Sequence, residues 1–115
     1  IKMANKGIYS YTVQEGTNAG LGQGGSMLIT GATAYSAPAG QVFVSITIIS
    51  DTAAFSKLTA VDPEMYINTA QATHDEAGTQ LTDSEPFTGG ITIYGRWTNI
   101  KMTADDIAIA YLGSE

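Results

Sequence analysis

Residues 89–113 read GGITIYGRWTNIKMTADDIAIAYLG, and this stretch decides the fold. Apolar and polar side chains alternate in its first part, which is the period of a β-strand because successive side chains point to opposite faces. The alternation resumes after Asp105-Asp106, a pair that favours a turn because aspartate bonds its own backbone. The sequence therefore predicts a strand, a turn and a second strand. On the predicted faces, Ile91, Ile93 and Trp97 oppose Thr92, Tyr94 and Arg96, and Ile107, Ile109 and Tyr111 oppose Ala108 and Ala110.

A change of face is expected inside the first of these two strands. Past Thr98, the apolar Ile100 and Met102 fall on the parity of the polar residues that precede Thr98. A strand that keeps its apolar side chains on one side must therefore turn, bulge or exchange faces near Thr98-Asn99. Arg96 lies where the faces change, and an ion pair between subunits is expected there.

Two strands of this kind need an opposing surface, since an isolated hairpin is marginal in water. Residues 41–50 are the strongest candidate, because they form a β-branched run that follows a turn at Pro38 and Gly40. The apolar face of this run is expected to cover Ile91, Ile93, Ile107 and Ile109. That face consists of Val42, Val44, Ile46 and Ile48, with Phe43 and Ile49 on the other side.

The remaining chain alternates short strands with loops. Residues 15–25 are rich in glycine and follow no strand or helix pattern, so a flexible loop is expected there. Residues 71–85 are polar, and Leu81 is their one apolar anchor. The other predicted elements are strands over 8–13 and 26–30, a connector over 33–40, a turn or 3₁₀ piece over 51–58, and a short strand over 65–69.

These elements predict an all-β protein with one domain over residues 1–115. The expected architecture is a β-sandwich or a small β-barrel of about six to seven short antiparallel strands. Within this domain, residues 1–38 are expected to form a Gly-rich N-terminal arm with the first strands, and residues 39–115 the β core. A chain of 115 residues is long enough to bury such a core without disulfides.

Composition and charge argue against several classes of function. Only 14% of the residues are charged, with 5 Lys plus Arg against 11 Asp plus Glu, whereas about 25% is usual. A net charge of −6 argues against nucleic-acid binding, which needs a basic patch. No run approaches the roughly 18 to 20 apolar residues of a membrane span, so no membrane partner is expected. The chain has no cysteine, which excludes thiol redox chemistry and thiolate metal sites.

The glycine-rich loop contains a weak match to a known fingerprint. Gly20, Gly22 and Gly25 fit the G-x-G-x-x-G pattern of dinucleotide-binding proteins. That pattern requires a following helix whose N-terminus meets the pyrophosphate, and the residues after Gly25 form a short apolar run instead. We therefore expect a loop without a cofactor.

Acidic clusters offer a second possible chemistry. His74 adjoins two carboxylates, but adjacent side chains on an extended chain point apart and cannot easily converge on one ion. A calcium site at Asp62, Glu64 or Asp105-Asp106 is an alternative that no EF-hand spacing supports. The sequence has one histidine and no nucleophile motif, so we expect no enzyme, no catalytic residue, no cofactor and no metal. The carboxylates next to His74 are Asp75 and Glu76.

The opening stretch also carries a resemblance to a known class of proteins. Residues 90–98, GITIYGRWT, followed by residues 109–113, IAYLG, resemble the terminal signature of small virion proteins of tailed bacteriophages. The strand over 43–49 and the residues DTAAFSKL at 51–58 are similar to theirs as well. The resemblance covers roughly residues 40–113, and its motifs contain no catalytic residues.

This resemblance implies a β-rich, non-enzymatic protein that works in copies on the virion, as a capsid decoration (cement) subunit or a head fibre. The expected partners are the major capsid protein or other virion proteins, the expected location is the capsid surface, and a homo-oligomer is expected, with a trimer favoured. The alternative is a receptor or carbohydrate-binding module of a phage fibre or spike, in which exposed aromatic side chains contact sugar. The candidate interface residues are Tyr94, Arg96, Trp97, Tyr111 and Phe87.

Overall fold

The computed structural model describes residues 24–70, 73–74 and 78–115, and in this part of the chain all regular structure is β. The all-β prediction is therefore confirmed. No helix in these residues is long and apolar enough to cross a membrane. The strands are β1 (Ser26–Thr30), β2 (Ala34–Ser36), β3 (Gln41–Ile48), β4 (Thr52–Ala53), β5 (Phe55–Ala60), β6 (Thr73–His74), β7 (Gly78–Thr79), β8 (Phe87–Thr88), β9 (Thr92–Met102) and β10 (Ile107–Ser114).

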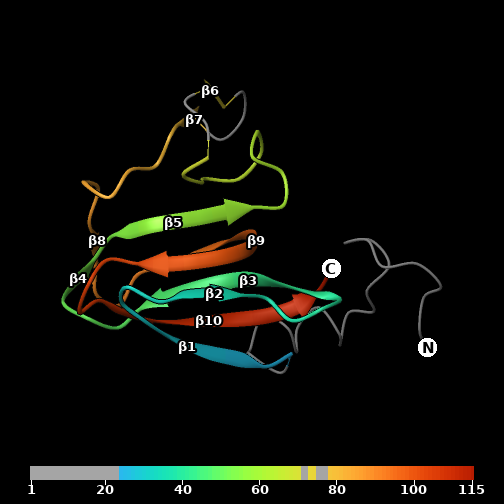
Figure 1. The fold of residues 1–115 in the computed structure, drawn as a ribbon, viewed down its shortest axis with the longest axis horizontal. Helices are drawn as coiled ribbons and strands as arrows, with labels where there is room; N and C mark the ends of the chain where they lie inside the picture. The colour runs from blue at the N-terminus through green and yellow to red at the C-terminus, as the bar shows by residue number, and fades with distance from the viewer. Residues whose placement is uncertain (1–23, 71–72, 75–77) are drawn as a thin grey trace.

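One six-stranded antiparallel sheet forms the body of the molecule (Figure 1). Its order is β1, β10, β3, β9, and β9 also pairs with β2 and β5. Strands β3 and β2 pair with successive parts of β9, since Phe43 lies opposite Trp97 and Ser36 opposite Asn99. The sheet curls into a half-barrel, and the backbone N–H of Ala32, just after β1, reaches the carbonyl of Met102 at 3.1 Å.

The predicted turn between the last two strands is present, but these strands do not pair with each other. The N–H of Asp106 donates to the carbonyl of Thr103 at 3.2 Å, and Asp105 has a positive φ of 69°. Strand β3 lies between β9 and β10 and pairs with both. The stretch 89–113 is therefore held together through residues 41–48.

The register of the sheet explains its core. Residues that lie opposite one another on paired antiparallel strands project to the same side, and the concave side collects the apolar ones. Trp97 is fully buried there, and its indole Nε1 donates to the carbonyl of Ile67 at 2.8 Å. Leu81 also joins this core, as predicted. The inward rows across the sheet are Leu112, Phe43, Trp97, Ala60; Met27, Ala110, Ile46, Ile93; Ile29, Ala108, Ile48; and Tyr35, Ile100, Leu58.

The two faces of β10 are divided as predicted, but the expectation that the isoleucine face is the covered one is wrong. Ala108 and Ala110 are fully buried, whereas Ile107 is 37% exposed and Ile109 is half-buried. The concave side of a curled sheet is the narrower side, and Ile29, Ile46 and Ile48 fill it next to Ala108 and Ala110, so small side chains fit there. Further along β10, Leu112 also faces inward. Residues 41–48 therefore do not cover Ile107 and Ile109. Ile93 does pack against the core, but Ile91 is 43% exposed.

Bulges account for the other faces that differ from the prediction. Ser45 lies opposite Tyr111 and Phe43 opposite Leu112, which leaves Val44 as an extra residue in β3. Phe43 consequently turns inward with Ile46 and Ile48, and the expectation that it lies on the opposite face is wrong.

The face exchange expected in β9 is confirmed. Asn99 lies opposite Thr59 and Trp97 opposite Ala60, so Thr98 is the extra residue of a bulge. Trp97 and Ile100 thereby project to the same side, although they are three residues apart.

Residues 51–58 form strands β4 and part of β5 and not the expected turn or 3₁₀ piece. Phe55 lies opposite Met102 and Lys57 opposite Lys101, so Ser56 is the extra residue of another bulge. Because of this bulge, Phe55 and Leu58 both face inward, and their helix-like spacing misled the prediction.

Two shorter segments also differ from expectation. The connector predicted over 33–40 contains β2, which pairs with β9. The strand predicted over 65–69 is a loop, because the N–H groups of Met65 and Tyr66 both donate to the carbonyl of Asp62 at 3.1 and 3.2 Å. Buried Asn68 fixes this loop by donating to the carbonyls of Pro63 and Tyr66, each at 2.7 Å. The strand predicted over 8–13 lies outside the described residues.

The buried ring of Trp97 leaves no room for a side chain at position 95, which glycine satisfies. A Cβ added at Gly95 would lie 2.7 Å from two atoms of the Trp97 ring, and the ring is held by its bond to Ile67. We predict that Gly95→Ala lowers the free energy of unfolding by about 1–3 kcal/mol, as overpacking usually does. Urea denaturation followed by the fluorescence of Trp97, the one tryptophan of the chain, measures this.

The matched control is Tyr94→Ala on the same strand. Tyr94 is 74% exposed, so its truncation should change the free energy of unfolding by less than about 0.5 kcal/mol. A Gly95→Ala protein with native stability and native emission would contradict the packing argument.

Candidate interaction surface

The convex side of the main sheet carries an unusual set of side chains, which we call the outer face. These residues lie opposite one another on β1, β10, β3 and the first half of β9, and none of them is charged. One row is Leu28, Ile109, Thr47 and Thr92; the next is Ser26, Tyr111, Ser45 and Tyr94; a third contains Thr30 and Ile107.

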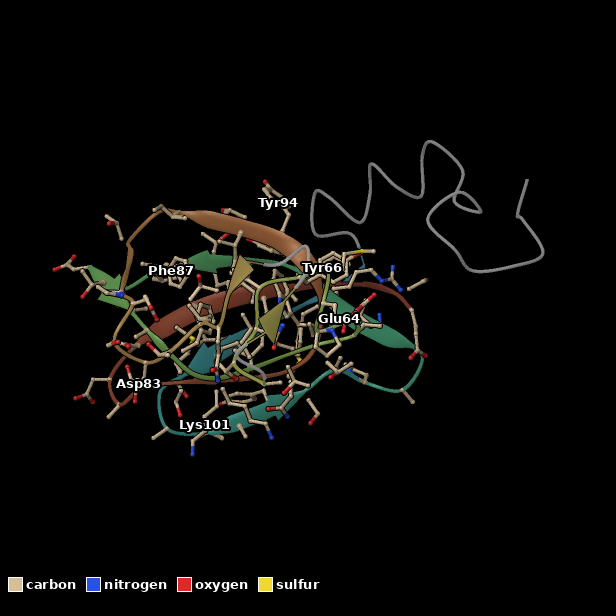
Figure 2. The ribbon with its side chains drawn as sticks, turned by 90° about the horizontal axis from the view of Figure 1, so that it is seen from above. Glu64, Tyr66, Asp83, Phe87, Tyr94 and Lys101 are labelled. Carbon is tan, nitrogen blue, oxygen red and sulfur yellow. The ribbon has the colours of Figure 1, made fainter. Side chains whose placement is uncertain are left out.

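The outer face presents apolar and aromatic groups to its surroundings. Tyr94 is 74% exposed and Leu28 is 59% exposed, and Figure 2 shows Tyr94 projecting away from the ribbon. The hydroxyls of Thr47 and Thr92 are 2.7 Å apart and bond each other. These two hydroxyls are already paired, so the groups that this face offers to a partner are its apolar side chains and the rings and hydroxyls of Tyr94 and Tyr111.

Two of the predicted interface residues meet on this face. Tyr94 and Tyr111 both lie opposite Ser45, on its two neighbouring strands. Ser45 itself is only 3% exposed between these strands. Arg96 is two residues beyond Tyr94, is half-buried, and forms no ion pair with the described residues. The ion pair with another subunit stays a prediction.

The other two predicted interface residues lie elsewhere. Trp97 is part of the subunit core and has no exposed surface. Phe87 is half-buried on β8 and packs edge-to-face on Phe55, with ring centroids 5.4 Å apart. Both rings stabilise the fold, and the Phe55–Phe87 pair gains more than its buried area alone.

Leu28 and Ile107 belong to the outer face but were not predicted. The run Met27-Leu28-Ile29 indicates a buried strand, and only the register with β10 reveals that Leu28 points outward. Because side chains alternate along a strand, Leu28 must point to the face opposite to that of Met27 and Ile29, and this alternation could have identified it.

Charges are separated by structural element in the described residues. Each described Asp and Glu lies outside the strands, and each described Lys and Arg lies within one. Lys57 and Lys101 are directly opposite each other on β5 and β9. In Figure 2, Lys101 lies on the side of the molecule opposite to Tyr94, so the cationic pair is remote from that end of the outer face.

The acidic residues considered as metal ligands have structural roles. Asp62 Oδ1 accepts the N–H of Glu64 at 3.1 Å, which closes a local turn. Asp106 Oδ2 accepts the N–H of Ala54 at 3.0 Å and the hydroxyl of Thr103. No group of three or more His, Cys, Asp or Glu side chains that could hold a metal occurs among the described residues.

The two remaining sequence clusters are only partly visible. His74 ends strand β6, while Asp75 and Glu76 lie outside the described residues. The residues 20–23 of the glycine fingerprint also lie outside them.

The carboxylate of Glu85 accepts two hydrogen bonds from Thr82 that lower its pKa. Its Oε2 accepts the hydroxyl of Thr82 at 2.5 Å and the backbone N–H of Thr82 at 2.7 Å. The hydroxyl bond first, and then the backbone bond, lower the pKa of Glu85 below its ordinary value by favouring the carboxylate. These bonds hold the turn over residues 82–85.

We predict that Thr82→Ala raises the pKa of Glu85 toward its ordinary value, because the stronger of the two donors is lost. An NMR titration of the Glu85 carboxyl measures this shift. Since the folded pKa is depressed, the contact stabilises the turn above the ordinary glutamate pKa and is lost as pH falls through the lowered one.

Thr88→Ala is the control, because Thr88 is exposed on β8 and makes neither of the two bonds to Glu85. An unshifted Glu85 pKa in the native protein would contradict the geometry.

Comparison with known proteins adds no functional assignment to these residues. The chain matches no family model, no curated protein and no solved structure. No residue role is therefore carried over from a relative.

Proposed function

We propose that the chain is a structural subunit of a bacteriophage virion, namely a capsid decoration subunit that binds and stabilises the head as a homo-oligomer. The observation that carries this proposal is the outer face, a convex sheet surface with exposed Tyr94 and Leu28 and no negative charge, with Arg96 two residues beyond Tyr94 at its end. Its partners are the major capsid protein or other virion proteins. The resemblance of residues 40–113 to virion proteins supplies the class of particle.

The chemistry of the outer face suits a protein partner. The centres of protein interfaces are depleted of charged residues and enriched in aromatic ones, Tyr among them. Tyr94 and Tyr111 share one row of this face, with Leu28 in the adjacent row. Burying these groups releases water from apolar surface, which is the main favourable term in protein association.

The placement of charge is consistent with this role. With every described carboxylate in a connection or at the end of the chain, the strands keep their faces free of negative charge. A net charge of −6 still keeps the free subunit soluble, because like-charged molecules repel each other in solution. Sheet contacts with a partner therefore need no compensating cations.

We predict that Tyr94→Ala weakens binding to capsids by roughly 5- to 30-fold, the range for a central aromatic residue worth about 1–2 kcal/mol. Co-sedimentation with purified virions and empty capsids of the phage that encodes the chain measures this. Met65→Ala is the matched control, since Met65 is 47% exposed but lies in the loop between β5 and β6. Equal binding of the native and Tyr94→Ala proteins, or none by either, would refute the proposal.

Host polysaccharide is the comparison ligand for the same proteins. A carbohydrate-binding module would be retained on it and would lose retention when Tyr94 becomes Ala, because exposed aromatic rings stack on sugars. Retention on polysaccharide without any binding to capsids would replace the decoration role with a receptor role.

A further inference from the structure

Strand β1 forms an edge of the main sheet, since among the described residues it pairs only with β10. The N–H of Leu112 donates to the carbonyl of Gly25, and the N–H of Gly31 donates to the carbonyl of Asp106. In an antiparallel pair, bonded and non-bonded residues alternate. Gly25 and Gly31 therefore direct their backbone N–H and C=O groups toward β10, and so do Met27 and Ile29. The backbone groups of Ser26, Leu28 and Thr30 point away from the sheet.

Nothing in the sequence of β1 protects this edge. Natural edge strands carry charges, proline or a bulge that prevents pairing with another chain. Strand β1 is SMLIT, and its register with β10 is unbroken from Ser26 to Thr30. Leu28, at its centre, is 59% exposed.

The opposite edge of the sheet is protected in several ways. Strand β5 has a bulge at Ser56 and an exposed Lys57. The loop that follows also covers it: the N–H of Thr69 donates to the carbonyl of Leu58, and the N–H of Leu58 donates to Thr69 Oγ1, each at 3.0 Å. The two edges therefore differ, and β5 is less available than β1 for pairing with another chain.

We infer that the occupant of the β1 edge is β1 of a second copy of this chain, paired antiparallel about a two-fold axis at Leu28. In this arrangement Leu28 lies opposite Leu28 of the partner subunit, and Ser26 opposite Thr30 of the partner subunit. The strand is self-complementary, because it has hydroxyl side chains at equal distances on both sides of Leu28 and no charge to repel its copy. The free backbone groups then bond each other across the axis.

The pairing has a consequence for the outer face. Leu28 and Ile109 lie in one row of the sheet, and the pairing extends this row through Leu28 of the partner subunit. One continuous sheet of two subunits then presents two copies of the outer face. This inference rests on the homo-oligomeric part of the proposed function and does not depend on its capsid part. A two-fold contact closes as a dimer, so the trimer favoured by the resemblance requires a different contact.

Light scattering of the full-length protein after size exclusion tests the assembly. We expect twice the chain mass of 12.0 kDa. Leu28→Lys places two like charges at the axis and should raise the dimer dissociation constant at least 10-fold. Leu28 is exposed, so circular dichroism should show an unchanged fold. Val61→Lys, at a loop position that is 44% exposed, should leave the dimer intact.

A cysteine cross-link tests the position of the contact. Residues bonded directly across an antiparallel pair have Cα atoms about 5.5 Å apart, which suits a disulfide. The native chain has no cysteine, so oxidised Leu28→Cys should yield a covalent dimer on a non-reducing gel, and Val61→Cys should not.

Three results would overturn the inference: a native monomer, a native trimer, or a Leu28→Cys protein that does not cross-link. A monomer without cross-link is also the result if residues 8–13 of the same chain, predicted to be a strand, occupy the edge. Co-sedimentation with capsids is a separate measurement, so loss of the capsid role leaves the mass and the cross-link unaffected.

Discussion

The fold depends on burying one indole ring inside a single curled sheet. Trp97 lies at the point where β9 changes partner, and its Nε1 donates to the carbonyl of Ile67 in the loop that closes over the sheet. A buried indole without such a partner would cost a desolvated N–H. Gly95 leaves room for the ring, and the bulge at Thr98 returns the following apolar residues to the same side.

Much of this fold can be predicted from the sequence, but the face of the sheet on which each side chain lies cannot. The strand content, the Asp105-Asp106 turn, the strong strand β3 and the face exchange in β9 are all readable from local pattern. The bulges at Val44 and Ser56 are not, because an extra residue shows only in the register with a partner strand. Each bulge reverses the faces beyond it, which is why Phe43 and residues 51–58 were misassigned.

The candidate surface could be predicted only in part from the sequence. Tyr94 and Tyr111 stand out as aromatic residues on strands, and they do share a row. Ile107 and Ile109 lie outside because Ile29, Ile46 and Ile48 fill the concave side next to Ala108 and Ala110, and Leu28 lies opposite Ile109 on the same outer side. Size, and not hydrophobicity alone, decides which side of a curved strand is inside. An alternating run of large and small apolar residues therefore identifies two faces without saying which is buried.

The order of strands in the main sheet has a kinetic meaning. No two strands that are consecutive in sequence pair there: β1 pairs with β10, β10 with β3, and β9 with β3, β2 and β5. Each pairing must close a long loop before it gains any contact, and domains built this way fold in roughly milliseconds to seconds where helical bundles take microseconds. Among the described strands, β1 has no neighbour until β10 has been synthesised and docked. An uncharged SMLIT segment thus stays available for intermolecular pairing longer than any other strand, and the yield of folded protein should depend on how dilute the chain is while it folds.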